Sequence, residues 1–216
     1  ESRLIAGSRR YFETFSRAVV AAVDREAYYR AKVLEQQQRH TKYNETPYSL
    51  EPNVKESPGG LRDLHVVLWI ARAAGYGTRW SELARRGLLT AAEANIIRLS
   101  ERRVKEIRAR LHLVTGRRED RLVFDVQNAV AQQAGFQPTA GKRASELLMQ
   151  HYYRAAKVIT QMNTAVLLNI EQRLFHRDDE PGVALDSTFL ARGELLDIDD
   201  EAAFARDPNG ILRAFL

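Results

Sequence analysis

The stretch Leu50-Glu-Pro-Asn-Val-Lys-Glu-Ser-Pro-Gly-Gly-Leu-Arg-Asp63 separates two helix-like regions and concentrates prolines, glycines and charged side chains. Its prolines favour extended backbone in the residues before them. The pair Gly59 and Gly60 lets the backbone lie against a ligand or another chain with no Cβ in the way. A helical stripe then begins, made of Leu61, Leu64, Val67, Leu68 and Ala71. The stretch therefore predicts an extended arm that leads through a glycine pair into the N-terminus of a helix.

An arm of this kind is typical of an anion site, because the free N–H groups and the dipole of a helix N-terminus both favour negative charge. Lys55 and Arg62 flank the glycines and could close such a site from either side. Arg62 in the first turn opposes the helix dipole by roughly 0.3–1 kcal/mol, and Asp63 or a bound anion would offset that cost. The same spacing also fits a plain turn with solvated charges, so the residues alone leave both interpretations open.

Apolar residues at helical spacing, punctuated by capping residues and glycines, predict helices along most of the remaining chain. Ser8 and Asp24 are candidate N-caps within residues 9–43, which form one long helix or two in succession. Thr90 and Glu93 form a capping box. The expected fold class is all-α, a bundle of long helices joined by short turns that end in glycine. The other expected helices are 61–74, 81–86, 91–114, 125–134 capped by Asp125, and 142–175, with stops at Gly75, Gly87, Gly116 and Gly135.

The pattern also predicts which helix faces meet the core. The first helix is expected to present Tyr11, Phe12, Phe15, Val19 and Ala22 on one face, and the second Ala27, Tyr28, Ala31 and Leu34. The polar end of the second helix, residues 35–42, is either solvated or a basic rim beside the motif. The arginine-rich face of 91–114 is either solvated and salt-bridged or a polyanion-binding stripe. His151 and Asn163 are expected to be satisfied polar groups of the core.

Composition excludes several classes of protein. The 216 residues include no cysteine, which excludes disulfides and thiolate metal sites. No apolar run approaches the roughly 20 residues that a membrane span needs. The net charge of +5 permits a phosphate-bearing ligand without indicating nucleic acid. We expect a cytoplasmic protein with no nucleic acid and no membrane as partner, and the missing initiator Met predicts a part of a longer protein.

The C-terminal region changes composition. Residues 177–182 predict a linker, 188–200 a small hairpin around Gly193, and 202–216 a docking tail. Asp197-Ile-Asp-Asp200 could place two carboxylates on one strand face, as in a magnesium site. No glycine turn and helix precede it, so an acidic cap for a helix at Glu201 is the favoured interpretation. No zinc spacing, nucleophile elbow or phosphate-binding glycine loop occurs, so we expect no catalytic and no metal-binding residue in this chain.

The motif Asn53-Val-Lys-x-x-Pro-Gly-Gly-Leu-Arg-Asp-Leu64 resembles the signature of the bacterial PII uridylyltransferase/uridylyl-removing enzymes. Further blocks in the same order fit that family, and the likeness covers most of the chain. A looser relative of the motif occurs in the glutamine synthetase adenylyltransferases. The further blocks are Glu35–His40, Arg110–Leu113, Gly116–Gln127 and Met149–Arg154.

The resemblance implies a place in a larger, multifunctional enzyme of nitrogen metabolism. In that family a nucleotidyltransferase domain with metal-binding aspartates lies upstream. An HD phosphohydrolase domain that removes the uridylyl group lies downstream, followed by glutamine-sensing ACT domains. This chain would be the helical middle section, inactive alone, of an enzyme that transfers UMP from UTP to a tyrosine of the PII signal protein with Mg²⁺. The implied boundaries are 1–7 for the exit from the transferase domain, 8–175 for the helical domain and 176–216 for a linker and docking tail.

The resemblance also implies roles for the motif. Lys55 and Arg62 would contact the triphosphate, because positioned cations accelerate phosphoryl-type transfers. The amides of Gly59 and Gly60 would orient the nucleotide, while Asn53 and Asp63 would fix the loop or reach the metal shell. Two alternatives stay open: a non-catalytic helical module that docks PII or couples the transferase and HD domains, and a relative of the glutamine synthetase adenylyltransferases.

Overall fold

The computed structural model describes residues 3–175, 183–186, 188–192, 195–198, 200 and 202–214. The chain divides into two compact units, residues 1–174 and 175–216. The described part is predominantly helical, as predicted, with one small sheet in the second unit. The helices of the first unit are α1 (Arg9–Ala21), α2 (Arg25–Lys42), α3 (Leu61–Ala73), α4 (Trp80–Arg85), α5 (Ala91–Thr115), α6 (Phe124–Gln133) and α7 (Ala144–Phe175).

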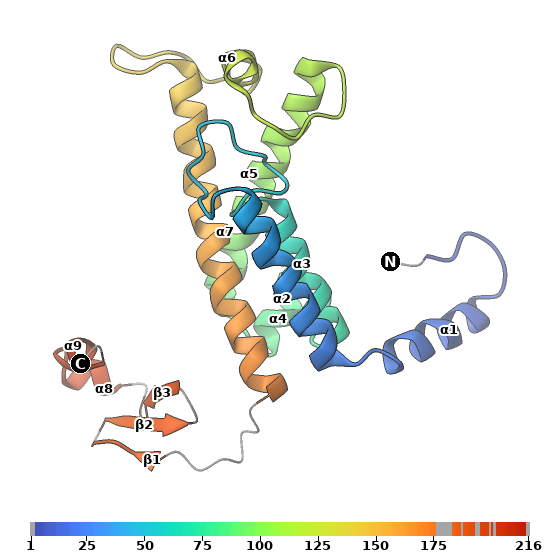
Figure 1. Ribbon diagram of the computed structural model, residues 1–216, viewed down its shortest axis with the longest axis vertical. Coiled ribbons are helices and arrows are strands. Elements are labelled where there is room, and N and C mark those ends of the chain that lie inside the picture. The colour runs from blue at the N-terminus through green and yellow to red at the C-terminus, as the bar shows by residue number, and fades with distance from the viewer. Residues whose placement is uncertain are drawn as a thin grey trace. The chain divides into compact units, whose positions relative to one another are not determined.

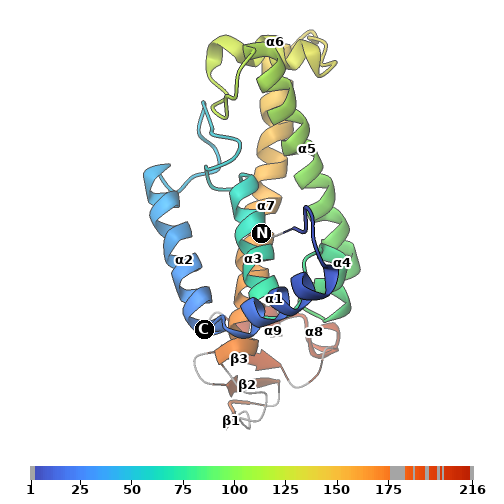
Figure 2. The same cartoon turned by 90° about the vertical axis from the view of Figure 1, so that its right-hand side faces the viewer.

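Four of these helices, α2, α3, α5 and α7, run side by side (Figure 1), and the turned view shows the same arrangement (Figure 2). The motif helix α3 is buried around most of its circumference, including Asp63 and Val66. It therefore lies at the centre of the bundle, where its first turn can meet side chains from α2 and α7. The largest fully buried apolar side chains of the long helices include Leu64 and Ile70 of α3, Ile97 and Leu111 of α5, and Leu148, Ile159 and Ile170 of α7.

Local capping chemistry places the helix ends close to where the sequence predicts them. Asp24 Oδ1 accepts a hydrogen bond from the Ala27 amide at 3.0 Å, so residues 9–43 form two helices. Thr90 and Glu93 form the predicted reciprocal box, with the Glu93 amide 3.1 Å from Thr90 Oγ1. Gly116 ends α5 in the left-handed region, at φ 65°. These signals involve neighbours within one turn, which is why they can be recognised in the sequence.

The predicted core faces of the first two helices are wrong. No residue of α1 is buried: Phe15 and Val19 of its apolar side line a pocket with Trp69 of α3 and remain 54% and 48% exposed. On α2 the exposed fraction of Leu34 is 54%, whereas Tyr29 and Gln36 are buried. The Tyr29 hydroxyl donates to the Leu167 carbonyl of α7 at 3.2 Å. Polar partners on α7, rather than apolar periodicity, therefore decide which face of α2 turns inward.

Two smaller predictions also need correction. Asp125 does not cap α6, which begins at Phe124; its first amide donates instead to Glu51 Oε1 of the arm, at 2.9 Å. A tertiary contact thus replaces the local cap. Of the two polar insertions in α7, Asn163 is a satisfied core residue, whereas His151 is only half-buried and lies against the Phe136 ring. Partial burial, with Arg103 and Arg154 nearby, lowers the pKa of the His151 ring below its ordinary value.

The second unit holds a three-stranded antiparallel sheet and two short helices. Strands β2 (Phe189–Arg192) and β3 (Leu195–Ile198) pair as the predicted hairpin, and β1 (Val183–Ala184) adds a strand at its other edge. The buried Phe189 ring contacts the Phe204 ring of α8 (Ala203–Arg206), and Arg213 of α9 (Gly210–Arg213) pairs with Asp207 at 3.1 Å. The tail therefore packs on its own hairpin. The expected linker, Gly193, Asp199 and the cap at Glu201 lie outside the described residues.

Candidate functional site

The arm before the motif is held against the loop that follows α5. The Val54 amide donates to the Asp120 carbonyl at 2.8 Å, and the Leu122 amide donates to the Pro52 carbonyl at 2.9 Å. Partial burial raises the pKa of the Asp120 carboxyl, but hydrogen bonds from Arg108 and His112 outweigh it and hold this pKa below its usual value. Ion pairs of Asp120 thus hold the loop on α5, and backbone hydrogen bonds hold the arm on the loop.

Asn53 fixes the conformation of the loop that carries Lys55. Its Oδ1 accepts hydrogen bonds from the backbone amides of Lys55 at 3.1 Å and Glu56 at 2.8 Å. Its own amide donates to Ser57 Oγ at 3.0 Å. Such an Asx turn is the usual way in which a short amide side chain shapes backbone. Of the two roles expected for Asn53, this geometry supports fixing the loop.

The glycine pair is required by the fold itself. Gly59 has φ +76°, and a Cβ placed on it would lie 2.5 Å from the carbonyl oxygen of Ala156 in α7. A Cβ on Gly60 would lie 2.7 Å from the Lys55 carbonyl oxygen. Gly59 therefore lies against α7 and Gly60 against the loop itself, and neither position has room for a Cβ.

The amides at the start of α3 already have acceptors within the chain. The Gly59 amide donates to Asp63 Oδ2 and the Gly60 amide to the Ser57 carbonyl, both at 2.8 Å. The Leu61 and Arg62 amides donate to the Val54 and Lys55 carbonyls. An anion at this place would consequently be bound by side chains rather than by the free amides that the sequence suggested.

Asp63 is fully buried and joins three segments of the chain. Its Oδ1 accepts hydrogen bonds from Arg39 Nη2 at 2.7 Å and His40 Nε2 at 2.8 Å, and its Oδ2 accepts from the Gly59 amide. Its backbone carbonyl accepts from Asn163 Nδ2 at 3.0 Å. Arg39 and His40 are therefore a basic rim against the motif, one of the two interpretations that the sequence left open. With all these donors in place, Asp63 acts as a structural anchor.

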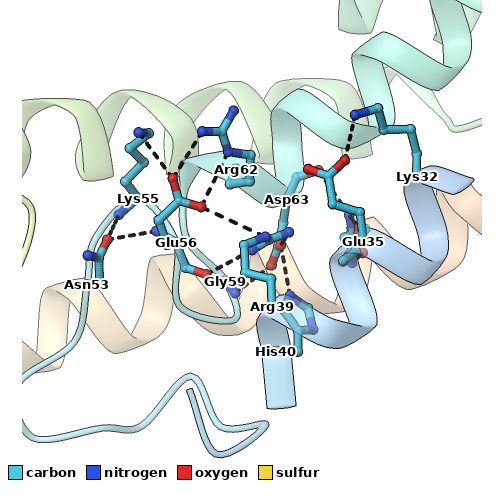
Figure 3. Close-up of polar contacts among 12 residues, drawn as sticks. Lys32, Glu35, Arg39, His40, Asn53, Lys55, Glu56, Gly59, Arg62 and Asp63 are labelled. Atoms are coloured by element: carbon cyan, nitrogen blue, oxygen red, sulfur yellow. Dashed lines mark hydrogen bonds and ion pairs between the residues drawn. The ribbon is translucent and has the colours of Figure 1, made fainter. Parts of the chain in front are cut away.

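Lys55 and Arg62 converge on one carboxylate, that of Glu56 (Figure 3). Lys55 Nζ lies 3.1 Å and Arg62 Nη2 3.0 Å from the same oxygen, Glu56 Oε1. Arg39 Nε lies 3.9 Å from the other oxygen, Oε2. Burial raises the pKa of the Glu56 carboxyl, but hydrogen bonds and charge from Arg62 and Lys55 outweigh it and leave this pKa below its ordinary value. The side chains of Lys55, Arg62 and Arg39 thus surround the Glu56 carboxylate with positive charge.

Sequence reasoning missed Glu56 and Tyr152. Glu56 gave a weak signal, an acid between the two cations that had been proposed to bind an anion. Tyr152 of α7 is not singled out by any motif, yet its buried hydroxyl has no hydrogen-bond partner among the described residues, and burial raises its pKa. Only the packing of α7 against the start of α3 brings that hydroxyl near the motif.

The cluster lies within a segment that matches a known protein family. The family model described as GlnD PII-uridylyltransferase matches residues 27–167, which contain every residue of the cluster. The chain belongs to the GlnD PII-uridylyltransferase family. The resemblance recognised in residues 53–64 is confirmed by this match, and the family is that of the uridylyl branch rather than the adenylyl branch.

Curated relatives carry the name bifunctional uridylyltransferase/uridylyl-removing enzyme. Those of Bordetella avium (strain 197N) and Cupriavidus pinatubonensis (strain JMP 134) are 52% and 50% identical over 216 residues, and that of Burkholderia orbicola (strain MC0-3) is 52% identical over 217. The matches cover 100% of this chain and 25% of each relative, so the chain spans about a quarter of the length of these proteins. No solved structure matches the chain.

No helix among the described residues is both long and apolar enough to cross a membrane. None of their His, Asp and Glu side chains gather in a group of three or more that could hold a metal ion.

Proposed function

We propose that this chain supplies the phosphate-binding cations of a PII uridylyltransferase, which transfers UMP from UTP to a tyrosine of the PII signal protein. The observation that supports the proposal most directly is the convergence of Lys55 and Arg62 on the single oxygen Glu56 Oε1. A position held by two cations within 3.1 Å is one that a phosphate oxygen can take. The family match supports the nature of the ligand.

In the proposed reaction the tyrosine hydroxyl gives up its proton to water, its oxygen attacks the α-phosphorus of UTP, and the bond from that phosphorus to pyrophosphate breaks. Negative charge grows on the departing pyrophosphate, so preorganised cations stabilise the transition state more than the ground state. Lys55 and Arg62 would hold the phosphate oxygens, and the Glu56 side chain, which is 23% exposed, would rotate outward to admit them.

The Mg²⁺ implied by the resemblance does not fit the carboxylates of this cluster. Both oxygens of Asp63 already accept hydrogen bonds from Arg39, His40 and the Gly59 amide, and Glu56 is bonded to two cations. In the proposed reaction the cluster would therefore contact phosphate oxygens rather than the metal ion. Asn53 and Asp63 would position the loop, and Gly59 and Gly60 would let it approach α7.

The test uses the full-length Bordetella avium relative, with its matching segment replaced by this chain. UMP incorporation into PII is followed by mass at varied UTP concentration. Lys55→Ala and Arg62→Ala should each lower kcat/KM for UTP about tenfold or more, since a charge-assisted hydrogen bond contributes roughly 1.5–3 kcal/mol. Glu56→Gln should act in the opposite direction and lower the KM, because it removes the charge that competes with phosphate.

Arg98→Ala is the matched control, an exposed arginine on α5 that bonds only to Asn95 among the described residues. It should leave the KM for UTP unchanged, because it removes a cation outside the Glu56 cluster. Normal rates and normal UTP affinity in both the Lys55 and Arg62 variants would show that the site is assigned to the wrong residues. A Glu56→Gln variant that behaves like Lys55→Ala would point to a structural role for the whole cluster.

A second candidate role is that of a docking or coupling module. It is favoured by the exposed arginines on the outer face of α5, where the Arg102 side chain is 73% exposed. Reversing Arg102 and Arg103 to Glu should then weaken binding of PII and leave the KM for UTP unchanged. If PII binds the reversed variant with normal affinity, this face is a solvated one.

A further inference from the structure

A groove of about 630 Å³ lies away from the phosphate cluster, between the first half of α7, the start of α6 and the arm. We call it the α6–α7 groove. Its apolar lining comes from Met149 and Tyr153 of α7 and from Tyr48, Leu50 and Phe124, with the Tyr48 and Tyr153 rings in contact. The exposed fractions of Leu50 and Phe124 are 65% and 57%, which is high for large apolar side chains that line one groove. A contiguous apolar surface of this kind typically marks a binding site.

Cations lie at both ends of the α6–α7 groove. Lys142 and Arg143 stand at the start of α7, and Arg154 and Lys157 stand three turns further along it. All four are exposed, and none has an ion-pair partner among residues 3–175. The single carboxylate in the lining is that of Glu146, which accepts a hydrogen bond from the Arg143 amide. The groove is therefore positive at its ends, and its middle carries apolar side chains with one carboxylate and no cation.

The spacing of the charges limits what can bind. Arg154 follows Arg143 by eleven positions along α7 and the residue before it, which at about 1.5 Å per residue is roughly 16 Å. An extended peptide covers that distance in about five residues, at roughly 3.3 Å each. A single strand of nucleic acid fits less well, because its phosphates recur at every nucleotide and would meet Glu146, Met149 and Gln150 in the middle, where the groove lining has no cation.

We propose that the α6–α7 groove binds an extended segment of a partner protein that has acidic residues about five positions apart and an aromatic or aliphatic side chain between them. The acidic residues pair with the cations at the two ends. The apolar side chain covers Phe124 and Leu50 and removes their exposed surface from water. This surface is separate from the UTP contacts and does not depend on them.

The test measures fluorescence anisotropy of a fluorescein-labelled peptide, Glu-Asp-Ala-Leu-Phe-Ala-Glu-Asp, on titration with the 216-residue chain at low ionic strength. Binding should be saturable and should weaken steeply with salt, as expected for exposed charge pairs. Two comparison peptides separate the contributions. In one, amides replace the four acids; in the other, the four acids stand together at one end. Both should bind at least about tenfold more weakly.

Variants of the chain locate the binding. The double variant Arg154→Glu/Lys157→Glu should weaken binding about tenfold, and Phe124→Ser should weaken it severalfold with no change in salt dependence. Arg85→Glu/Arg118→Glu is the matched control, since it reverses two exposed cations outside the groove. Circular dichroism and the urea midpoint check that every variant is folded.

Three outcomes would overturn the proposal: no saturable binding, equal binding of the amide peptide, or equal loss in the control variant. Tighter binding of an eight-nucleotide single-stranded DNA, lost in Arg154→Glu/Lys157→Glu, would assign the groove to nucleic acid instead.

Discussion

Gly59→Ala is the perturbation that most sharply tests why the motif contains glycine. The added Cβ would lie 2.5 Å from the Ala156 carbonyl oxygen and 2.8 Å from the Ala156 Cβ. The neighbour is backbone of α7, which cannot rotate away as a flexible side chain can. The residue also has φ +76°, a conformation that alanine adopts only with strain.

The two effects can be given magnitudes. The left-handed backbone costs a non-glycine residue about 1–2 kcal/mol, and an overpacked contact costs about 1–3 kcal/mol. The variant should therefore lose about 2–5 kcal/mol of unfolding free energy, a large part of the roughly 5–15 kcal/mol that holds an ordinary domain folded.

Gly75→Ala separates the two effects. Gly75 has nearly the same backbone conformation, φ +80°, but nothing lies within 4 Å of the position of its Cβ. It should lose only the strain of about 1–2 kcal/mol. Urea unfolding followed by far-UV circular dichroism measures both. Equal losses in the two variants would refute the claim that contact with α7 requires glycine at 59.

Three further predictions concern the buried polar groups. Asp63→Asn should destabilise the bundle by about 3 kcal/mol in urea unfolding, because Arg39 keeps its charge and loses its buried counter-ion. Asp120 has a lowered pKa, so its contribution to stability is present above the unfolded-state pKa and is lost as pH falls through the folded-state pKa. Urea midpoints between pH 7 and pH 3 should therefore fall less steeply in Asp120→Asn than in the unaltered chain. Gln36→Leu and Asn163→Leu should each cost about 1–3 kcal/mol, and the double variant less than their sum, since each single change strands a buried amide. Additive losses in that double-mutant cycle would contradict the pairing.

The comparison of sequence with structure separates two kinds of information. The capping box at Thr90, the cap at Asp24 and the left-handed stop at Gly116 were predictable, because each is completed within about one helical turn. The motif residues 53–64 were also recognisable as a family signature, and the comparisons confirm that family. The expected contacts of Lys55 and Arg62 with nucleotide remain a prediction.

The errors share one cause. The predicted face of α2 was wrong because its buried side carries Gln36 and Arg39, polar residues that periodicity assigns to solvent. Their partners, Asn163 and Asp63, lie 127 and 24 residues away along the chain. The predicted cap of α6 failed for the same reason, because Glu51 reaches it across 73 residues.

The sequence by itself thus determined where most helices begin and end and to which family the chain belongs, since both depend on residues close together in the chain. The tertiary structure alone decided which side of α2 is buried and why Gly59 has to be glycine. It also decided that Lys55 and Arg62 meet at one oxygen of Glu56. The physical reason is that a buried polar or charged group is stable only where its partner is supplied, and these partners come from segments that meet only in the folded chain.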